Sequence, residues 1–371
     1  MTAKGANKLA IFLPSLNGGG AERVMLNVAH GLVEYGCAVD LLLAQANGPY
    51  LSQVHETIRI VDLKASRVLS SLPTLIRYLR RERPVVILSV LNHVNIVALL
   101  ARRLARVTTR VVVSEHNTLS RASQNASRWR SRFVPPLIKR FYPWADSIVA
   151  VSKGVADDLA KQVKIPRERI QVIYNPVVTP ELREGAKSSL DHVWFMPGQP
   201  PVVLAVGRLK TQKDFPTLIR AFAQVRQRHP ARLMILGEGP DRPALEALVK
   251  QLGLEGEVAM PGFVENPYAY MRRASVFVLS SLWEGLPTVL IEALYCGAPI
   301  IATDCPSGPR EILAGGGYGI LVPVGDVMAL AQAIEAGLAG ETPHPTEESW
   351  QPYSQEVVVD QYISLLFNGQ A

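Results

Sequence analysis

Short hydrophobic segments, many of them rich in Val, Ile and Leu, alternate with amphipathic segments along most of the chain. Examples are Lys8–Leu13, Val85–Val90 and Arg110–Ser114 in the first half, and Val202–Val206 and Arg232–Leu236 in the second. Strands that are apolar along their whole length are buried on both faces, and strands that alternate with helices form parallel sheets. The pattern therefore predicts an α/β fold in which helices cover both faces of parallel sheets.

The alternation breaks down once, between residues 179 and 200, where proline and glycine replace the regular pattern. The chain has 371 residues, which exceeds what a single hydrophobic core usually accommodates. We therefore expect two doubly wound domains, over residues 1–185 and 200–345, and a C-terminal helix over residues 346–371 that packs back towards the first domain. Doubly wound sheets bind ligands outside the carboxyl ends of their strands, so we expect the domains to face each other across a ligand-binding cleft.

Positive charge is concentrated in the first half of the chain. The formal net charge is +7, but residues 1–190 hold 27 Lys and Arg against 13 Asp and Glu, and residues 191–371 hold 12 against 19. Most of the excess lies in residues 59–140, which contain 17 basic and 3 acidic residues. Aromatic residues lie among and just after the last of these charges: Trp129, Phe133, Phe141, Tyr142 and Trp144.

Three interpretations of this basic stretch are open. Clustered Lys and Arg with aromatic rings suit an anionic membrane surface. A nucleic acid would attract the same charges, and a solvated basic face would need no partner at all. Because no nucleic-acid-binding motif accompanies the charge, we favour the membrane surface and expect no nucleic-acid partner.

Cysteine usage and hydrophobicity argue against several classes of protein. Cys37, Cys296 and Cys305 form no Cys-x-x-Cys pair, which disfavours a disulfide framework and a cysteine-rich zinc site and fits a reducing cytosol. Lys8–Leu13 is followed by Pro14 and a glycine cluster, as expected of a first strand rather than a signal peptide. No uninterrupted apolar stretch approaches the roughly 18 residues of a membrane span, so any membrane contact should be peripheral.

A glycine cluster, Gly18-Gly19-Gly20, follows the first predicted strand and opens a predicted helix. Glycines let the backbone approach an anion closely, and a helix N-terminus offers unpaired N–H donors, so Gly18 and Gly19 are candidate contacts for a phosphate-bearing donor. The alternative is a tight strand-to-helix turn with no ligand. Arg23 replaces the third glycine of a dinucleotide fingerprint, and the Gly-Lys-Ser/Thr end of a P-loop is missing, which argues against NAD and ATP.

Two cations follow the first predicted strand of the second domain. Gly207 allows the chain to turn at the end of that strand, Arg208 comes next, and Lys213 precedes a predicted helix. Two cations beside a helix N-terminus suit a diphosphate, because the guanidinium group can hold two oxygens at once. Two solvated surface charges are the alternative.

Two glutamates flank the start of another predicted helix. Glu284 lies in the loop before Pro287, a residue well suited to open a helix, and Glu292 lies within the helix among apolar residues. A carboxylate can accept hydrogen bonds from the paired hydroxyls of a sugar, and an acidic residue in an apolar run is costly unless it has a partner. A glycosidase would also use two carboxylates, but the two cations would then have no role.

Together these motifs resemble those of the retaining nucleotide-sugar glycosyltransferases of family four. The resemblance extends from about residue 8 to about residue 340 and is most specific between residues 201 and 325. It is carried by the Gly18–Gly20 loop, Val206–Leu209 with Lys213, Leu236–Pro240, and Glu284 to Glu292. It implies the GT-B fold, in which an acceptor-binding and a nucleotide-sugar-binding Rossmann-like domain face each other across a deep cleft.

The resemblance implies roles for residues around the two cations. Arg208 and Lys213 would bind the donor diphosphate and stabilise the leaving group, so no metal and no other cofactor is expected. The transferred sugar would be held by Glu284 and by the backbone of Gly285, Leu286 and Pro287.

It also implies roles for residues further away. Glu292 would accept the hydroxyls of the nucleotide ribose, and Gly262 and Val264 lie where the family packs the base. His116, at the end of a predicted strand, resembles a histidine that the family places near the transferred sugar. A structural or surface histidine is the alternative.

The implied reaction is transfer with retention at the anomeric carbon. The run Asp304–Ile312 resembles a subset of the family that transfers hexoses or N-acetylhexosamines from UDP donors to lipid-linked oligosaccharides or lipopolysaccharide. We therefore expect a cytosolic enzyme, peripheral on the inner face of the membrane, that extends a lipid-linked or cell-surface glycan. A non-catalytic subunit of the same fold that binds nucleotide sugars or glycans is the alternative, which the four charges Arg208, Lys213, Glu284 and Glu292 disfavour.

Overall fold

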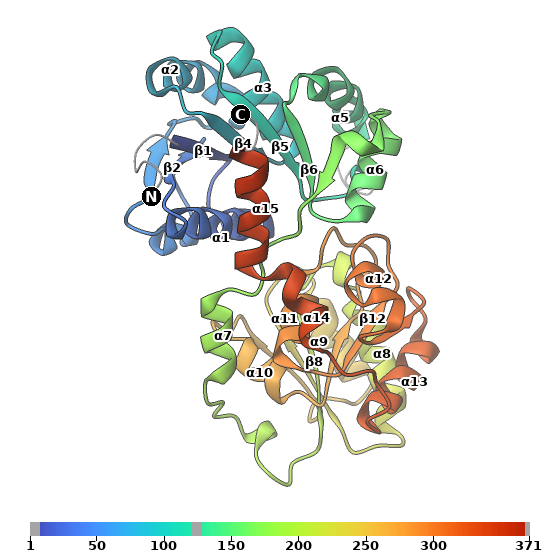
Figure 1. Ribbon diagram of the computed structural model, residues 1–371. Coiled ribbons are helices and arrows are strands. Elements are labelled where there is room, and N and C mark those ends of the chain that lie inside the picture. The colour runs from blue at the N-terminus through green and yellow to red at the C-terminus, as the bar shows by residue number, and fades with distance from the viewer. Residues whose placement is uncertain (1–7, 121–127, 368–371) are drawn as a thin grey trace. The chain divides into compact units, whose positions relative to one another are not determined.

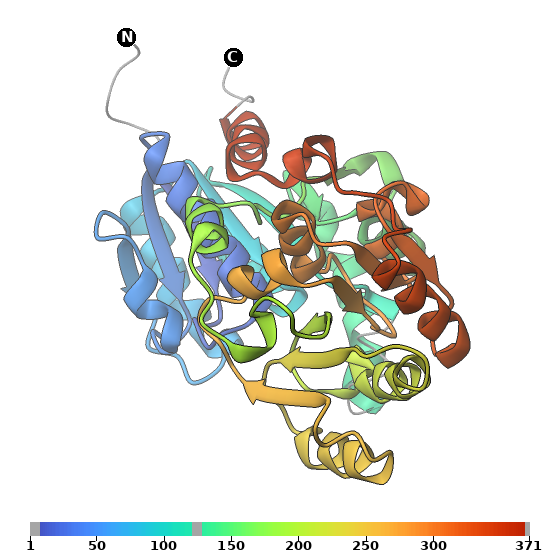
Figure 2. The same cartoon turned by 90° about the horizontal axis from the view of Figure 1, so that it is seen from below.

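The computed structural model describes residues 8–120 and 128–367, and the side chains of these residues except 128–134. The chain divides into two compact units (Figures 1 and 2). Unit 1 is Met1–Pro176 together with Ser354–Ala371, and unit 2 is Val177–Tyr353.

Unit 1 is built around a parallel sheet of seven strands in the order β3-β2-β1-β4-β5-β6-β7. Its strands are β1 (Lys8–Leu13), β2 (Ala38–Leu43), β3 (Arg59–Asp62), β4 (Val86–Val90), β5 (Arg110–Glu115), β6 (Ser147–Ala150) and β7 (Ile170–Val172). Its helices are α1 (Gly20–Glu34), α2 (Leu72–Glu82), α3 (Asn92–Ala105), α5 (Arg128–Phe141), α6 (Lys153–Val163) and α15 (Gln355–Phe367). Figure 1 shows α2 and α3 on one side of this sheet and α1 on the other.

One part of the hydrophobic core of unit 1 forms where α1 and α15 meet the sheet. Leu9 and Ile11 of β1, Met25 of α1 and Leu366 of α15 are fully buried in one hydrophobic cluster. Burying such a side chain stabilises a fold by about 1.5–3 kcal/mol. The two helices approach closely at Gly31, because a Cβ atom there would overlap the side chain of a valine on α15. Helix α15 is therefore a part of unit 1, although it ends the described chain.

Unit 2 is built around a parallel sheet of six strands in the order β10-β9-β8-β11-β12-β13. Its strands are β8 (Val202–Val206), β9 (Arg232–Leu236), β10 (Val258–Gly262), β11 (Val276–Leu279), β12 (Ile300–Thr303) and β13 (Ile320–Val322). Its helices are α7 (Pro180–Lys187), α8 (Phe215–Arg226), α9 (Arg242–Gln251), α10 (Tyr268–Arg273), α11 (Thr288–Cys296), α12 (Pro309–Ile312), α13 (Val327–Leu338) and α14 (Glu347–Trp350).

Unit 2 begins earlier than the sequence indicates. Residues 177–185, which the sequence assigns to the first domain, belong to unit 2 because α7 packs on α10. The Asn266 side-chain amide fixes this contact by donating a hydrogen bond of 2.9 Å to the Gly185 carbonyl. At the other end, residues 346–353 belong to unit 2, and only the helix that follows them belongs to unit 1.

Both sheets reverse their strand order once, which confirms the predicted doubly wound α/β fold. The reversal lies between β1 and β4 in unit 1 and between β8 and β11 in unit 2. Parallel strands present their carboxyl ends at one edge, and loops that leave neighbouring strands in opposite directions open a crevice there. The loops after β1, β4, β8 and β11 are therefore the places where each unit is expected to bind ligands.

Candidate functional site

The loops after β8 and β11 meet at the reversal point of unit 2. The Lys213 ammonium group, in the turn between β8 and α8, donates a hydrogen bond of 2.6 Å to Oε1 of Glu284, in the loop between β11 and α11. The two side chains are only 13% and 8% exposed. Lys213 and Glu284, which the sequence assigns to the diphosphate and to the sugar, thus form one buried ion pair.

Two further side chains fix the Glu284 carboxylate. The Ser281 hydroxyl donates to Oε1 at 2.6 Å, and the Gln212 amide donates to Oε2 at 3.3 Å. A buried carboxylate requires such donors, and bonds to an ionised group are among the strongest in proteins. Sequence reasoning missed both residues. The sequence holds one signal for Ser281, which stands with Ser280 directly after the fully apolar strand β11, and none for Gln212.

Backbone contacts join the same two loops. The Leu282 N–H donates to the Gln212 carbonyl at 2.8 Å, and the Ser280 hydroxyl donates to the Lys213 carbonyl at 2.6 Å. Gly207 packs beneath the lysine, because a Cβ atom there would lie 3.2 Å from Cε of Lys213. Contacts to the backbone of both loops therefore support the ion pair in addition to the side chains that bond to Glu284.

Two more cations share this loop. Arg208 is exposed and Lys210 is half-buried, and within the described residues neither forms an ion pair. Burial lowers the pKa of Lys210, and the positive charges of Lys213 and Arg208 lower it further. Three cations thus stand beside one carboxylate, and this excess favours an anionic ligand. Lys210 was not among the predicted site residues.

Glu292 lies on α11, whereas Glu284 lies in the loop before that helix. Glu292 is half-buried, and its negative charge adds to burial in raising the pKa of the Cys296 thiol, one turn further along, to about 12. Pro287 directly precedes the helix rather than forming its first residue. The two carboxylates therefore stand on different elements.

The segment Gly285–Pro287 is supported by the loop after β12. The Ser307 hydroxyl donates to the Gly285 carbonyl at 2.9 Å, and the Glu284 N–H donates to the Pro306 carbonyl at 3.2 Å. Gly308 has φ +97° and packs so closely that a Cβ atom would overlap the Pro287 ring. The proline- and glycine-rich run that the sequence singled out thus shapes the backbone next to Glu284.

Gly262 and Val264 lie at the carboxyl end of β10, two strands away from β8. Gly262 has φ +97°, and its carbonyl accepts a hydrogen bond of 2.8 Å from the Gly237 N–H. Val264 is half-buried, whereas Phe263 between them is 77% exposed. An exposed aromatic ring at this edge offers a flat surface for stacking.

In unit 1, the glycine cluster forms the turn between β1 and α1. Gly18 has φ +94°, a conformation that favours glycine, and Gly19 caps the helix. The Gly19 N–H donates to the Glu22 carboxylate at 3.1 Å, and Ser15 contacts the same carboxylate at 3.4 Å. The turn is exposed, but the Glu22 carboxylate already accepts a hydrogen bond from one of its N–H groups.

His116 follows β5 and is 7% exposed. Its Nε2 atom lies 3.2 Å from the hydroxyl oxygen of Ser114, which is fully buried. Burial lowers the pKa of His116 to about 3, so the imidazole is neutral at pH 7. His116 can therefore orient a ligand through a hydrogen bond, but it adds no positive charge.

A buried carboxyl group, Glu115, lies next to this histidine. The Tyr142 hydroxyl and the Asn95 amide both donate to Oε1 of Glu115, the latter at 3.2 Å. Burial raises the pKa of Glu115 to about 7, although both hydrogen bonds act in the opposite direction. Sequence reasoning did not identify this cluster, because an acidic residue at a strand end gives no sign of its burial.

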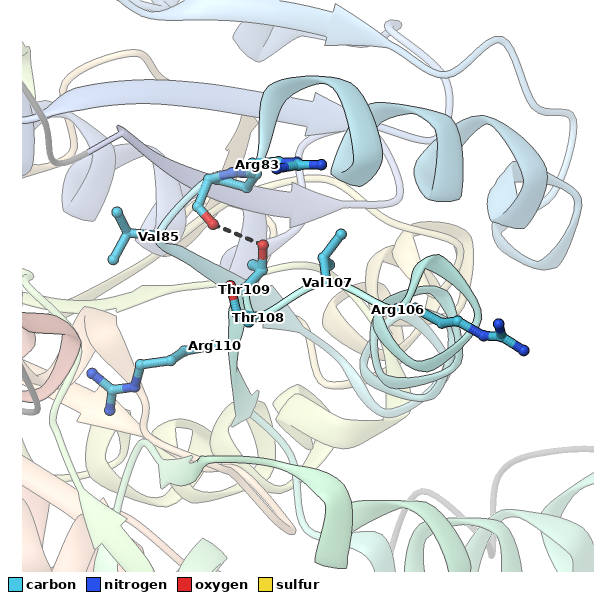
Figure 3. Close-up of a pocket in the computed structure, with 8 residues that line it drawn as sticks. Arg83, Val85, Arg106, Val107, Thr108, Thr109 and Arg110 are labelled. Carbon is cyan, nitrogen blue, oxygen red and sulfur yellow. Dashed lines mark hydrogen bonds between the residues drawn. The ribbon is translucent and has the colours of Figure 1, made fainter.

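A pocket of about 450 Å³ lies at the other edge of the unit 1 sheet, before the amino ends of β4 and β5 (Figure 3). Arg83 and Arg106 extend to one side of it and Arg110 to the other. Arg110 donates to the Leu366 carbonyl at the end of α15 at 2.9 Å, and Thr109 donates to the Pro84 carbonyl at 2.8 Å. The pocket is thus remote from the strand ends that carry Gly18 and His116.

Titratable side chains give no sign of a metal centre in the described residues. Within 8–120 and 128–367, no three His, Cys, Asp or Glu side chains are grouped so as to hold a metal ion. The thiols of Cys37, Cys296 and Cys305 are all free. No helix in the described part of the chain is long and apolar enough to cross a bilayer.

Comparison with known proteins identifies the family. A model described as "Glycosyltransferase Family 4" matches residues 18–180, and one described as "Glycosyl transferases group 1" matches residues 188–357. N-acetylgalactosamine-N,N'-diacetylbacillosaminyl-diphospho-undecaprenol 4-alpha-N-acetylgalactosaminyltransferase of Campylobacter jejuni is 32% identical over 342 residues, or 89% of this chain and 90% of that protein. The lipopolysaccharide core biosynthesis glycosyltransferase LpsE of Rhizobium meliloti is 26% identical over 368 residues, or 94% of this chain and 96% of that protein.

Solved structures give the same fold. HepE of Anabaena, in complex with UDP and glucose, superposes with a TM-score of 0.78 at 20% identity, covering 98% of this chain and 100% of that one. The lipopolysaccharide outer core galactosyltransferase WaaB superposes with a TM-score of 0.73 at 21% identity, covering 97% and 99%. With two doubly wound units and these relatives, the chain belongs to the family 4 glycosyltransferases and has the GT-B fold.

Proposed function

We propose that this glycosyltransferase moves a hexose or N-acetylhexosamine from a UDP-sugar, with retention, to a lipid-linked or cell-surface glycan acceptor. The observation that carries the proposal is the Lys213–Glu284 pair at the β8/β11 reversal, with two further cations beside it. The name of the Campylobacter jejuni relative includes a diphospho-undecaprenol-linked substrate, and HepE was solved with UDP and glucose. These names support the acceptor and donor classes.

The cations are suited to the donor diphosphate. Lys213 carries three N–H donors, and its bond to Glu284 uses one of them. Arg208 and Lys210 extend the positive field outward from Lys213. Fixed cations stabilise the negative charge that grows on a departing diphosphate without reorganising during the reaction. We therefore propose that transfer needs no added metal ion.

The carboxylates are suited to the sugar and the ribose. Oε1 of Glu284 accepts two bonds of 2.6 Å, from Lys213 and Ser281, whereas Oε2 accepts one longer bond from Gln212. Oε2 therefore has lone-pair capacity for a sugar hydroxyl. In this proposal the Gly285–Pro287 backbone lines the sugar, and Glu292 accepts the ribose hydroxyls.

The base and the remaining contacts complete the proposed arrangement. The base would lie against Gly262 and Val264 at the end of β10, with the exposed Phe263 ring beside it. Gly18 and Gly19 would approach the donor from unit 1, and His116 would contact the transferred sugar as a neutral hydrogen-bonding group.

The chemistry is a substitution on one face of the sugar. The bond between the anomeric carbon and the diphosphate oxygen breaks, and its electron pair stays on that oxygen. The acceptor hydroxyl attacks from the same face, and its proton passes to the departing phosphate oxygen. Lys213 and Arg208 stabilise the negative charge on the leaving group throughout the step. No other group has to supply this charge stabilisation.

A donor panel tests the proposal. The protein is incubated with UDP-, GDP- and ADP-sugars, with and without a lipid extract as acceptor, and nucleotide release is measured. We expect release from a UDP-sugar that EDTA does not abolish, and NMR of the product should show the anomeric configuration of the donor. Absence of release from every donor would refute the proposal.

A matched pair of variants tests the site. Glu284→Gln should reduce transfer by about 100-fold or more, since it removes a carboxylate on which the transition state depends. Glu255→Gln, an exposed residue of the same unit, should leave transfer unchanged. Equal rates for the two variants would contradict the role of Glu284.

We also propose that unit 1 contacts an anionic membrane surface, where a lipid-linked acceptor would be found. Arg83, Arg106 and Lys139 are exposed, lie at the carboxyl ends of α2, α3 and α5, and form no ion pair within the described residues. Helices that precede parallel strands end at the amino edge of the sheet, so these three cations share one edge. Each would contribute about 1 kcal/mol near anionic lipid.

The aromatic part of the membrane hypothesis needs correction. Tyr142 is fully buried, and the Trp144 ring is covered by the guanidinium groups of Arg103 and Arg140, at 4.5 and 5.2 Å. Trp129 and Phe133 lie outside the described side chains. The proposal therefore rests on the exposed cations and not on the aromatic residues.

A further inference from the structure

We propose that Thr303, at the carboxyl end of β12, is a positioning residue for Glu284 and acts through Ser281. The inference rests on the proposed function, in which Glu284 holds the transferred sugar. It extends the site from the loops after β8 and β11 to β12, the strand that lies next to β11 in the sheet.

Strand β12 continues beyond the point where β11 leaves the sheet. The last pair between the two strands joins Leu279 to Ala302, and the next residue of β12, Thr303, pairs with Val322 of β13. Ser281 lies two residues beyond the last residue of β11. Its backbone carbonyl is buried with the rest of the residue and therefore needs a hydrogen-bond donor from outside the ladder.

The Thr303 side chain supplies this donor. Its hydroxyl donates to the Ser281 carbonyl at 2.6 Å and lies 3.3 Å from the Leu279 carbonyl oxygen. A hydroxyl has one proton to donate, so the shorter contact is the principal hydrogen bond. Thr303 is 1% exposed and Ser281 is fully buried, so water is a poor substitute for this donor.

Ser281 transmits the constraint to Glu284. Thr303 fixes the Ser281 carbonyl, and the Ser281 hydroxyl donates to Oε1 of Glu284 at 2.6 Å. The same oxygen accepts a hydrogen bond of 2.6 Å from Lys213. Ser281 and Lys213 thus fix Oε1, and this sets the position of Oε2, the atom proposed to accept a sugar hydroxyl.

Loss of the Thr303 hydroxyl would displace Ser281. Its carbonyl would remain buried without this donor, which costs free energy unless the loop shifts towards another donor. The Ser281 hydroxyl would move with the carbonyl, because both belong to one residue, and the Glu284 carboxylate would follow. A displacement of about 1 Å at a catalytic group can reduce the rate about 100-fold.

The kinetic test uses Thr303→Val, which keeps the shape of the side chain and removes the hydroxyl. We expect kcat for sugar transfer to fall about tenfold, while the Kd for UDP, which carries no sugar, stays the same. Thr303→Ser keeps the hydroxyl and should retain most of kcat, whereas Thr303→Ala should lose as much as Thr303→Val. Ser281→Ala should also reduce kcat, and the double variant with Thr303→Val should lose no more than the worse single one.

The matched control is Thr109→Val in unit 1. Thr109 is 3% exposed, and its hydroxyl donates to the Pro84 carbonyl at 2.8 Å (Figure 3). The two valine variants therefore remove the same kind of buried hydrogen bond. Both should lower the midpoint of urea unfolding by a similar amount, but Thr109→Val should keep full kcat.

The outcomes separate this inference from the proposed function. Undiminished kcat in Thr303→Val, or an equal loss in Thr109→Val, would overturn the role of Thr303. Weaker UDP binding in Thr303→Val would indicate general damage to the donor site and would overturn it as well, and so would losses that multiply in the double variant. Absence of nucleotide release by the unaltered protein from every donor would instead refute the proposed function, before any variant is compared.

Discussion

The pairing of Lys213 with Glu284 makes the two residues depend on each other for stability as well as for function. Both side chains are largely removed from water, at 13% and 8% exposure. Removing one partner of such a pair leaves a charge that water no longer solvates and that nothing neutralises. Variants of either residue therefore report on folding and on catalysis together, and the two effects must be separated.

Lys213→Met should lower the free energy of unfolding by roughly 3 kcal/mol, because Glu284 remains buried without its cation. Combining Lys213→Met with Glu284→Gln in one protein should restore most of this stability but no activity. Urea titration measures both effects. Lys187→Met is the control, because its ion pair with Glu184 is 68% and 75% exposed and should contribute less than about 1 kcal/mol. Equal losses in Lys213→Met and Lys187→Met would contradict the burial argument.

Glu115 and His116 are neighbours whose pKa values shift in opposite senses. The pKa of Glu115 rises from 4.5 to about 7 on folding, so its contribution to stability is full below pH 4.5 and is lost as the pH rises to about 7. The pKa of His116 falls from 6.5 to about 3, so its contribution is full above pH 6.5 and is lost as the pH falls. Between about pH 4.5 and 6.5, Glu115 therefore makes the free energy of unfolding fall with pH, whereas His116 makes it rise.

Substituting either residue should therefore reveal the pH dependence of stability that the other residue contributes. Glu115→Gln should make stability rise with pH between 5 and 6.5 more steeply than in the unaltered protein, by about 1.4 kcal/mol per pH unit. His116→Gln should make stability fall with pH by a similar amount. Thermal unfolding across this range measures both slopes. A change of the same sign in both variants would exclude this assignment.

At the level of elements, the site of unit 2 is a set of loops that brace one another. The loop after β12 supports the segment Gly285–Pro287, and the loop after β8 is joined to the loop after β11 by backbone hydrogen bonds. Gly308 is the tightest of these contacts, because its backbone lies against Pro287 and the Gly285 carbonyl. Loop–loop packing thus sets the geometry around Glu284.

Gly308→Ala should damage the site through this contact. A Cβ atom would displace the Gly285–Pro287 segment, so we expect KM for the donor to rise and the free energy of unfolding to fall by about 2 kcal/mol or more. Gly315→Ala is the matched control, since Gly315 has φ +70° but no atom within 4 Å of a new Cβ. It should lose only the backbone cost of about 1–2 kcal/mol and keep its KM. Donor titration and urea unfolding test the pair, and an unchanged KM in Gly308→Ala would disprove the bracing.

The sequence predicted the strands that are apolar along most of their length, because such a composition indicates burial on both faces. Strand β8 is apolar throughout and β1 is apolar after its first residue, Lys8, and both lie where the sequence predicts them. The edge strands β3 and β13 were not expected, because β3 is largely exposed and β13 has three residues. The sequence predicts a linker where α7 lies, because Pro180 stands at its start, yet proline suits the first turn of a helix. Thr179 caps this helix by accepting a hydrogen bond from the Leu182 N–H at 3.3 Å.

The site residues could likewise be predicted only as far as local sequence indicates them. The residue types of Lys213 and Glu284 were predictable, because two cations before one predicted helix suit a diphosphate and a carboxylate before another suits the hydroxyls of a sugar. Their direct contact was not, since it depends on how β8 and β11 pair across a separation of about seventy residues. Ser281 and Gln212 carry common side chains that acquire a role only from that pairing.

Over the whole molecule, the charge is divided between the units. Unit 1 holds 25 Lys and Arg against 13 Asp and Glu, and unit 2 holds 14 against 19. Much of the positive charge in unit 1 has an internal partner: Arg59 pairs with Asp40 and Arg102 with Asp146, while Arg80 and Arg110 bind the terminal carbonyls of α3 and α15. The cations that remain for an external partner are therefore fewer than the 25 basic residues of the unit.

That available charge gives a direct test of the membrane proposal. The protein should float with vesicles that contain anionic lipid and not with neutral vesicles, and flotation should weaken with salt because exposed charges are screened. Reversing three of the exposed cations that form no ion pair within the described residues, Arg83, Arg106 and Lys139, to Glu should abolish flotation, since each contributes about 1 kcal/mol and the reversal adds repulsion. These residues are exposed and form no ion pair within the described chain, so the folded state should tolerate the change.

The control reverses three exposed cations of unit 2: Arg220, Lys250 and Arg272. It changes the net charge of the protein by the same amount, so it separates a specific surface from a general electrostatic effect. We expect the control to float as the unaltered protein does. Equal loss in both variants would mean that total charge alone governs binding, and undiminished flotation of the unit 1 variant would place the membrane contact away from Arg83, Arg106 and Lys139. Either result would overturn the assignment of the membrane surface to the amino edge of the unit 1 sheet.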